Sequence, residues 1–187
     1  MAQRYVLTWS GPEGSSHTNL YLRVPLFYMK TPEEYMKIAL LEAKKAEKLD
    51  EVPVGAIVVR NGEVIAKAHN LKEKKQLACA HAEVLAIQKA SKKLGTWNLQ
   101  DCDLYVTLEP CMMCSGNIML SRIHALYYGT QDYKGGTIDT LIQVKTIPHL
   151  NTYPKEIYPN ILHDECAEIL TNFFKRKRLL KKQNKSL

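Results

Sequence analysis

The stretch TLEPCMMC at residues 107–114, preceded by the triplet HAE, decides what kind of fold and site this chain can form. Cys111, Cys114 and His81 offer two thiols and an imidazole, and Glu83 adds a carboxylate beside them. A structural zinc site uses four protein ligands, whereas a catalytic zinc keeps three and leaves the fourth position to water. A nearby carboxylate can carry the protons of that water. The pattern therefore predicts a catalytic zinc centre.

Other interpretations of the same residues remain open. A C-x-x-C pair also occurs in redox sites and in zinc fingers. Cys79, two residues before His81, is a possible fourth ligand; it would close the site into a structural one and leave Glu83 an ordinary surface acid. The remaining two cysteines, Cys102 and Cys166, are interpreted as small buried hydrophobic residues.

The elements around these motifs predict an α/β layer fold. Thr31-Pro32-Glu33-Glu34 is a capping box with proline at the first helical position, and the helix that it begins continues to about Leu49. Residues 54–60 and 63–68 flank an Asn61-Gly62 turn and are predicted to form an antiparallel hairpin. Strands separated by helices favour some parallel pairing behind this hairpin. The alternating segments are residues 80–94, 104–108, 112–121, 124–129 and 163–180.

Both motif pieces lie at predicted helix starts. Pro110 suits the first helical position, and Cys111 and Cys114, three residues apart, then share one face of the first turn. The positive end of the helix dipole favours their thiolates. His81 and Glu83 are two residues apart, which in a regular helix turns them about 200° away from each other. We expect both to face the metal because the first turn relaxes this constraint, since a cap residue leaves helical dihedrals.

The chain has 187 residues, of which 45% are hydrophobic, as expected for one compact domain. Five cysteines with one close pair favour metal chemistry in a reducing compartment over a disulfide framework, so we expect a cytoplasmic protein. Residues 1–28 show neither a secretory signal nor a membrane span, and they are interpreted as a leader added for expression or an over-extended start. Residues 29–187 are predicted to hold the functional domain, ending in a basic helix and tail over about 163–187.

The net charge of +7 is concentrated at the C-terminal end. No acid follows Glu168, and a basic segment of this kind favours binding to a polyanion such as nucleic acid. A solvated basic terminus is the alternative. The Phe173-Phe174 pair favours RNA, because aromatic rings stack on unpaired bases, although core packing explains at least one of the two rings equally well. The seven cations after Glu168 are Lys175, Arg176, Lys177, Arg178, Lys181, Lys182 and Lys185.

Taken together, these motifs resemble the bacterial tRNA-specific adenosine deaminases of the cytidine deaminase-like superfamily. The H-x-E and P-C-x-x-C signature is a known mark of the zinc deaminases of nucleobases. The flanking matches and the Phe-Phe-basic end are similar to the tRNA branch. The resemblance covers Thr31 to about Arg178. The motifs that carry it, besides HAE and TLEPCxxC, are Val52-Pro53-Val54-Gly55-Ala56, His69-Asn70-Leu71, Ser121-Arg122-Ile123, Asp132-x-Lys134-Gly135-Gly136 and Asp164-Glu165-Cys166-Ala167.

The resemblance implies a three-layer α/β/α fold with a mixed five-stranded sheet, assembled as a homodimer. It also implies hydrolytic deamination of adenosine to inosine at the wobble position of a tRNA anticodon. Zn²⁺ would be held by His81, Cys111 and Cys114, and Glu83 would transfer the protons. Residues that the family uses for RNA correspond to Asn70 at the flipped base, Asp132 and Lys134 at neighbouring nucleotides, and Phe173, Arg176 and Arg178 along the anticodon stem-loop.

Several positions depart from the family pattern and leave the recognition of individual bases open. Ser115-Gly116-Asn117 replaces a small apolar triplet, and Asn117 is predicted to leave an unsatisfied amide near the site or the dimer face. Gln131 and Tyr133 flank Asp132, and Asn151-Thr152 stands where an Asn-His pair is usual.

Two other functions fit part of the sequence. One is deamination of a free base or nucleotide such as guanine, cytosine or deoxycytidylate, which needs no basic tail. The other is a non-catalytic RNA-binding protein that is stabilised by zinc. In that case Asn70 would only cap a turn, and Asp132 and Lys134 would only form a solvated loop.

Overall fold

The computed structural model describes residues 30–150 and 154–184. The proposed leader, residues 1–28, and the Asn151-Thr152 pair lie outside this part of the chain. Helix α1, Pro32–Lys48, begins with the predicted capping box. Thr31 Oγ1 accepts a hydrogen bond from the Glu34 backbone N–H at 3.3 Å, and Glu34 Oε2 accepts one from the Thr31 N–H at 2.7 Å. The local sequence signal at the start of this helix is therefore confirmed.

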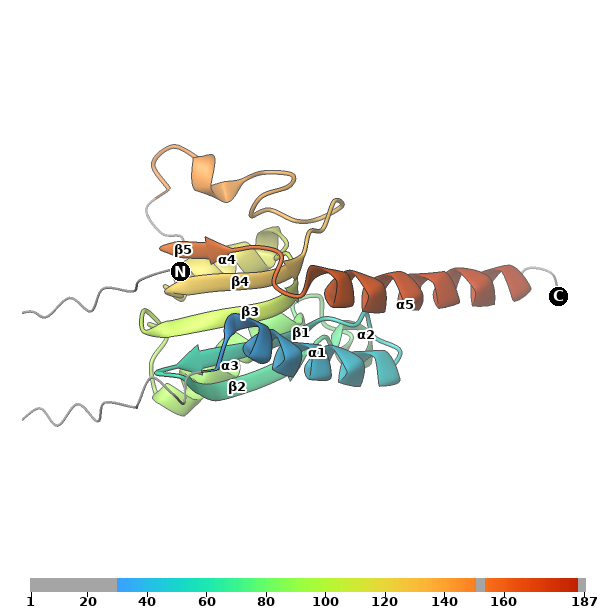
Figure 1. Cartoon of the computed structure of the whole chain (residues 1–187), viewed down its shortest axis with the longest axis horizontal. Helices are drawn as coiled ribbons and strands as arrows, with labels where there is room; N and C mark the ends of the chain where they lie inside the picture. The colour runs from blue at the N-terminus through green and yellow to red at the C-terminus, as the bar shows by residue number, and fades with distance from the viewer. Residues whose placement is uncertain (1–29, 151–153, 185–187) are drawn as a thin grey trace, which may run out of the picture.

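A mixed five-stranded sheet forms the centre of the fold, as the resemblance implied (Figure 1). The strand order is β2-β1-β3-β4-β5. Strand β1 pairs antiparallel with β2 and β3, whereas β4 pairs parallel with β3 and β5. The strands are β1 Gly55–Arg60, β2 Glu63–His69, β3 Cys102–Leu108, β4 Ala125–Thr130 and β5 Glu156–Tyr158.

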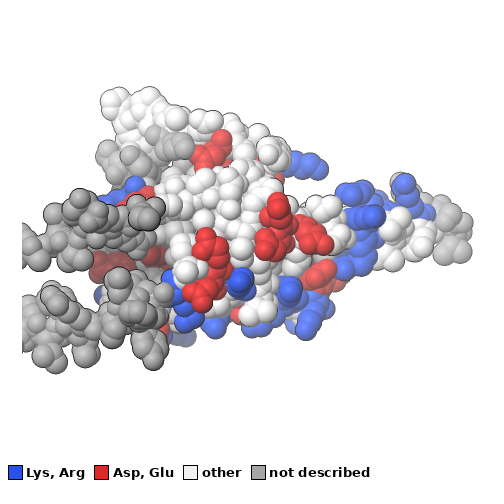
Figure 2. Space-filling view, in the orientation of Figure 1, with Lys and Arg blue, Asp and Glu red and all other residues white. Residues whose placement is uncertain are grey.

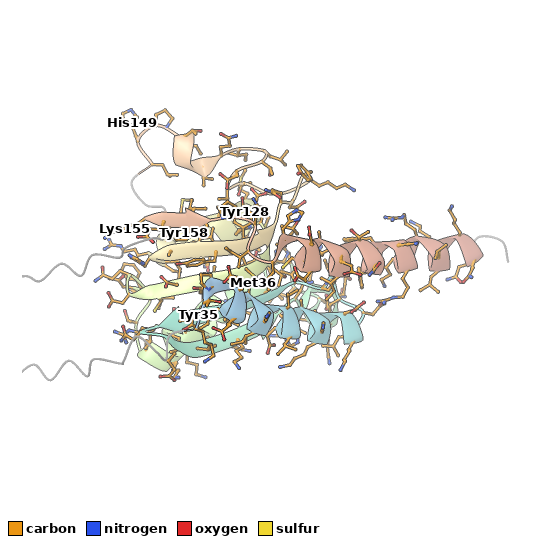
Figure 3. All side chains as sticks on the ribbon, in the orientation of Figure 1. Tyr35, Met36, Tyr128, His149, Lys155 and Tyr158 are labelled. Atoms are coloured by element: carbon orange, nitrogen blue, oxygen red, sulfur yellow. The ribbon has the colours of Figure 1, made fainter. Side chains whose placement is uncertain are left out.

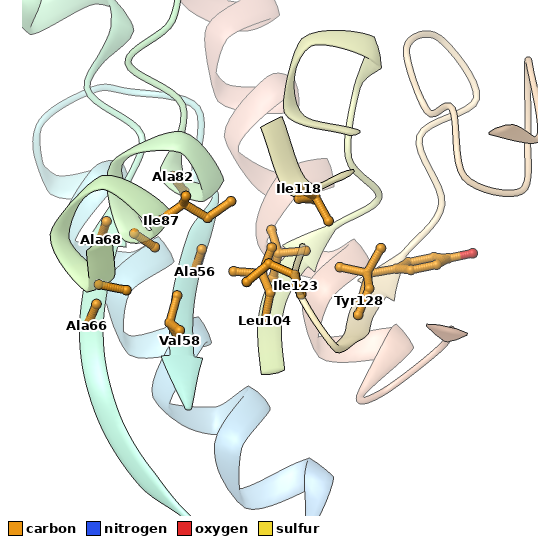
Figure 4. Packing of buried hydrophobic residues seen from close by; sticks show 14 of the residues in the cluster. Ala56, Val58, Ala66, Ala68, Ala82, Ile87, Leu104, Ile118, Ile123 and Tyr128 are labelled. Carbon is orange, nitrogen blue, oxygen red and sulfur yellow. The ribbon is translucent and has the colours of Figure 1, made fainter. Parts of the chain in front are cut away.

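Helices cover both faces of the sheet and complete the three predicted layers. Helix α1 and helix α5, His163–Gln183, lie on one face, where they contact β1, β3 and β4. Helix α3, Ala82–Leu94, and helix α4, Met112–Leu120, lie on the other. Figure 4 shows Ala82 and Ile87 of α3 over the small side chains of β1 and β2. Small residues let this helix approach the sheet closely, which brings the start of α3 near the sheet edge.

Alternate residues of each strand point to opposite helix layers. Ile57 and Tyr105 pack with α1, while the neighbouring Ala56 and Leu104 pack with α3 and α4. Cys166 of α5 is completely buried against β4, where a side chain on Gly129 would lie 2.3 Å from its sulfur atom. The interpretation of Cys166 as a buried hydrophobic residue is confirmed, and Cys102, at 1% exposure, behaves in the same way.

Four tyrosines form a row of ring contacts on the α1 face of the sheet. Figure 3 labels the two at its ends, Tyr35 and Tyr158. The ring centroids of Tyr105 and Tyr127 are 4.2 Å apart, and those of Tyr127 and Tyr158 are 4.5 Å apart, both in stacked geometry. Tyr35 of α1 closes the row at 5.1 Å from Tyr105. Each such pair contributes about 0.5 to 1.5 kcal/mol beyond burial. These contacts dock the three-residue strand β5, which sequence periodicity did not locate.

In the described part of the chain, two further short helices were not predicted. They are α2, Lys72–Lys75, and a 3₁₀ turn at Val144–Thr146. Helix α5 is longer than expected and projects beyond the body of the molecule (Figure 1). No helix in the described part of the chain has the length and hydropathy needed to cross a bilayer.

Candidate active site

The candidate metal ligands meet at the starts of two helices. His81 is the N-cap of α3 with φ −78° and ψ 153°, and Cys111 is the N-cap of α4 with φ −75° and ψ 173°. Cys114 lies in the first turn of α4 and is fully buried. The ligand atoms of these three residues all lie within 4.8 Å of one another. The structure thus brings together the three residues that the sequence suggested.

The distances within this cluster suit a tetrahedral zinc ion. His81 Nδ1 lies 3.7 Å from the Cys111 sulfur and 3.5 Å from the Cys114 sulfur. Typical Zn–S and Zn–N bonds place neighbouring N and S ligands about 3.6 Å apart in a tetrahedron. Among residues 30–150 and 154–184 the cluster contains three ligands and does not include Cys79. This geometry supports an open site and gives no support to a closed one.

Helix α4 begins at residue 112, as the predicted segment does, whereas helix α3 begins at residue 82, two residues later than its predicted segment. Helix α4 begins at Met112, so Pro110 precedes the cap and is not the first helical residue. The reason is that Cys111 forms an isolated antiparallel bridge with Gly136, which holds Cys111 in an extended conformation. Helix α3 begins at Ala82, so His81 is extended and Glu83 is the second helical residue. The prediction that His81 and Glu83 face the same site is therefore met by the cap geometry.

The two thiols have opposite pKa shifts without a metal. A hydrogen bond with Cys114, helped by the hydrogen bond to His81, lowers the pKa of Cys111 to about 4 despite partial burial. The same contact with Cys111, together with burial, raises the pKa of Cys114. The pKa of His81 is raised, chiefly by its hydrogen bond to Cys111. Metal binding at this site must therefore displace the proton of Cys114, and it competes with protonation of the His81 imidazole.

Glu83 is 4% exposed and lines the same pocket as His81 and Cys111. Burial raises the pKa of its carboxyl group above the ordinary value for glutamate. A carboxyl group with a raised pKa can both accept and return a proton near neutral pH. Its position in the first turn of α3 aims this group at the ligand cluster rather than at bulk solvent.

One pocket of about 670 Å³ contains most of the predicted site residues. His81, Glu83 and Cys111 form its metal side, and Cys114 lies buried behind them. The pocket is large enough for a nucleoside, and its rim is both polar and aromatic. The other lining residues are Val52, Val54, Asn70, Lys72, Leu108, Glu109, Gln131, Asp132, Tyr133, Lys134, Leu170, Thr171, Phe174 and Arg178.

Asn70 is oriented by a buried acid that sequence reasoning missed. Its Nδ2 donates a hydrogen bond to Glu51 Oε2 at 3.1 Å, and Glu51 is 1% exposed. Glu51 Oε1 also accepts from the Lys74 backbone N–H at 2.6 Å. A carboxylate only accepts, so the Asn70 amide turns its nitrogen to Glu51 and its oxygen away from it. No local sequence signal marks Glu51, because an acid in a loop before a strand is usually exposed.

The two phenylalanines of α5 have different surroundings. Phe173 is 2% exposed, and the Arg176 guanidinium lies 5.3 Å from the centre of its ring. Arg176 also forms a 3.0 Å ion pair with Glu47 of α1. Phe173 and Arg176, both proposed as RNA contacts, thus lie where they anchor α5 to α1.

Phe174 and Arg178 line the pocket instead, and Phe174 is 44% exposed. The sequence analysis assigned Phe173 and Arg178 to the anticodon stem-loop; Arg178 lines the pocket, whereas Phe174, and not the buried Phe173, is the phenylalanine that reaches it. The helical spacing of Leu170, Phe174 and Arg178, four residues apart, is the signal that separates this face from the core face. Figure 2 shows the basic side chains that gather along α5 beyond this point.

The layered α/β fold, together with a His-Cys-Cys cluster that opens on a pocket beside a buried acid, defines a deaminase of the cytidine deaminase-like class. Comparison with known proteins agrees with this class. The MafB19-like deaminase family matches residues 31–178. A tRNA-specific adenosine deaminase from Bacillus subtilis (strain 168) is 48% identical over 82% of this chain and 95% of its own length. The chain belongs to this family of tRNA-specific adenosine deaminases.

Solved structures extend the comparison. A structure from a study of A-to-I editing by tRNA:A34 deaminases at the wobble position has a TM-score of 0.71 and 42% identity, over 73% of this chain and 99% of that one. A guanine deaminase from Bacillus subtilis has a TM-score of 0.52 and 38% identity, over 55% of this chain and 66% of that one. The fold is therefore shared with an enzyme of a free base.

Proposed function

We propose that this protein catalyses hydrolytic deamination of adenosine to inosine at position 34, the wobble position, of a tRNA anticodon. The observation that carries the proposal is a buried Glu83 beside a three-ligand cluster, at the bottom of a pocket whose rim is basic and aromatic. A closed zinc site would need no such acid, and a free-base enzyme would need no such rim.

The residues present fit Zn²⁺, and His81, Cys111 and Cys114 would hold it. When bound there, the ion supplies a Lewis acid that makes water a better nucleophile near neutral pH. Glu83 takes a proton from the attacking water and passes it to the ring nitrogen of adenine. The carboxylate then takes the second proton from the hydroxyl group newly added at C6 and gives it to the departing amino group, so that adenosine and water become inosine and ammonia.

The rim of the pocket suits an unpaired nucleotide. Asn70 presents its amide beside the site, and we propose that it hydrogen-bonds the flipped base. Asp132 and Lys134, which also line the pocket, would contact the neighbouring nucleotides, and Phe174 would stack on a base. An anticodon loop is already single-stranded, so turning out one adenine costs less than opening a duplex.

Incubation of the purified, zinc-loaded protein with tRNA transcripts tests the proposal directly. We expect inosine only at the wobble adenosine, with one ammonia released for each inosine. Parallel reactions with guanine, cytosine and deoxycytidylate test the free-base alternative. Conversion of a free base without conversion of tRNA would reject the proposed substrate, and RNA binding without any conversion would favour the non-catalytic alternative.

Arg178→Ala is expected to weaken RNA binding and to change its salt dependence. Arg178 is exposed, lines the pocket and lies among the cations of α5, so we propose that it contacts a phosphate. Losing one phosphate contact reduces the slope of log K against log salt by about 1. Titration of a fluorescent anticodon stem-loop at several salt concentrations measures this slope. Lys92→Ala, an exposed cation on the far end of α3, is the control that should leave the slope unchanged.

We also propose a homodimer that pairs the outer surfaces of α4. Met112 and Leu120 are 61% and 73% exposed, and an apolar helix surface of this kind usually contacts a partner. Within the described residues, Asn117 Oδ1 is buried without a hydrogen-bond partner, as its sequence position had suggested. Leu120→Asp is expected to give a monomer in sedimentation experiments. Leu179→Asp, at a leucine of α5 that is 54% exposed, should not; dissociation by both variants would argue against an α4 interface.

Two further proposals follow from the chemistry of the site. We propose that residues 29–187 work as one deaminase domain whose last part, about 163–187, is a basic RNA-binding helix and tail. We also propose a cytoplasmic location. Two of the five cysteines must stay reduced to bind a metal, and the proposed substrate is a tRNA. Fractionation of cells that express a tagged chain checks this location.

A further inference from the structure

Glu109 is a buried acid that the reaction does not use. It lies between strand β3 and the ligand Cys111, and it is 2% exposed. Oε1 accepts backbone N–H hydrogen bonds from Ile138, Asp139 and Thr140 at 3.0, 2.8 and 3.2 Å. Oε2 accepts one from the Asp132 N–H at 3.1 Å, and the Thr140 hydroxyl lies 3.1 Å from the same oxygen. One side chain thus gathers the backbone of residues 132–140.

Residues 132–140 are here called the rim loop, because Asp132 and Lys134 line the pocket. Other contacts tie the rim loop to the same turn that carries the metal ligands. The Thr137 N–H donates to Pro110 O at 3.0 Å, and the hydroxyls of Thr137 and Ser115 lie 2.8 Å apart. Gly136 pairs with Cys111 across an isolated bridge. The rim loop is therefore bonded to the same turn that carries the metal ligands.

Gly136 shows how closely the rim loop approaches this acid. A Cβ atom at Gly136 would lie 2.3 Å from Glu109 Oε2 and 2.6 Å from Thr140 Oγ1. Only glycine permits that approach, since either contact is far shorter than a van der Waals distance. Glu109 of the Glu-Pro-Cys sequence and Gly136 of the Gly-Gly sequence are therefore in direct contact, although more than 20 residues separate the two sequences.

We propose that Glu109 is a positioning residue, which fixes Asp132 and Lys134 relative to the metal ligand Cys111 and so sets how tightly RNA beside the target base is held. This inference rests on the proposed RNA substrate. A loop that is ordered before binding loses less conformational entropy when RNA arrives. The hydrogen bonds described for Glu109 go to the rim loop, and none of them goes to a metal ligand.

Glu109→Gln tests the inference because it keeps the shape of the side chain. Both carboxylate oxygens of Glu109 accept hydrogen bonds from backbone N–H groups, whereas glutamine has only one oxygen. In either orientation of the glutamine amide, its NH₂ group faces at least one of these N–H groups, so at least one buried donor loses its acceptor. Amide hydrogen exchange in residues 132–140 is expected to accelerate by roughly tenfold or more, while exchange in α1 stays unchanged. Unchanged exchange in the rim loop would overturn the inference whatever the enzyme's activity.

A double-mutant cycle separates positioning from general destabilisation. In the wild-type background, Glu109→Gln should lower kcat/KM for the anticodon stem-loop by roughly ten- to a hundredfold, mainly through KM. In an Asp132→Ala/Lys134→Ala background the same change should cost less than about threefold, because the groups that Glu109 positions are already gone. Glu42→Gln, at another buried carboxylate on the far side of the sheet, should leave kcat/KM unchanged.

An equal loss in both backgrounds would reject positioning and leave the proposed function intact. If the wild-type protein converted no tRNA, the proposed function would fail. The dissociation constant of the stem-loop, measured for the same four proteins of the cycle, would then still decide whether Glu109 acts through Asp132 and Lys134.

Discussion

Glu83→Gln is expected to abolish deamination while the fold and the bound metal are retained. Glutamine has the size of glutamate and fits the same buried position, but it cannot accept and return a proton. Each general acid or base step is typically worth about 10²- to 10⁴-fold in rate, and Glu83 serves in more than one step. We therefore expect a loss of at least roughly 10³-fold in kcat. Ammonia release from tRNA measures the loss of activity, and zinc content by atomic emission measures whether the metal is retained.

The matched control for Glu83→Gln is Glu42→Gln. Glu42 is 5% exposed and lies in α1, where it pairs with Lys45 and His69 and does not line the pocket. It should keep nearly full activity. Retention of activity in Glu83→Gln would remove Glu83 from the proposed mechanism. RNA binding without deamination by the wild-type protein would instead favour the non-catalytic interpretation.

Glu83→Gln also has a predictable effect on stability in the metal-free protein. Burial raises the folded-state pKa of Glu83, so this carboxyl group favours the folded state below its unfolded pKa and loses that contribution as pH rises through its folded pKa. Glutamine has no charge to desolvate. The Tm of Glu83→Gln relative to wild type should therefore increase as pH rises from the acidic range to neutrality, in samples treated with a chelator.

Cys114→Ser is expected to remove both the metal and the activity. Cys114 is fully buried, and its sulfur is one of only three candidate ligand atoms in the cluster. If the roughly 10 to 16 kcal/mol of a four-ligand structural zinc site is shared evenly, one ligand is worth about 2.5 to 4 kcal/mol. Metal affinity should thus fall by roughly a hundred- to a thousandfold. Zinc content after dialysis against a weak chelator, and tRNA deamination, measure the two losses.

Cys79→Ser is the control for this experiment, since it also removes one thiol near the site. Cys79 lies outside the ligand cluster, so its serine variant should keep zinc and activity. Equal zinc loss from both variants would indicate a closed four-ligand site and would contradict the open coordination on which the proposed function depends.

Much of the fold could be predicted because its signals are local. The capping box at Thr31 and the Asn61-Gly62 turn satisfy backbone groups within a few residues, and both form as expected. The His81 and Cys111 motifs also lie at helix starts as predicted. Strand β5 escaped prediction because its three residues carry no periodic pattern and are held by stacking of Tyr158 on Tyr127.

The residues that support the site were harder to find. Glu51 and Glu109 look like surface acids in the sequence, and only the folded chain buries them under backbone N–H groups from other segments. In the same way, the rotation of α5 about its own axis places Phe173 in the core and Phe174 at the pocket.

The sequence alone determined the ligand types, the acid beside them and the α/β alternation, because ligand chemistry and secondary-structure periodicity depend on residue identity and short spacing. Only the tertiary structure decided that Cys79 lies apart from the cluster, that Asn70 is oriented by Glu51, and that the rim loop is tied to Glu109. Those relations join residues that are close in space but not in sequence. Burial and hydrogen-bond partners at such contacts depend on how the layers pack, and no short pattern encodes them.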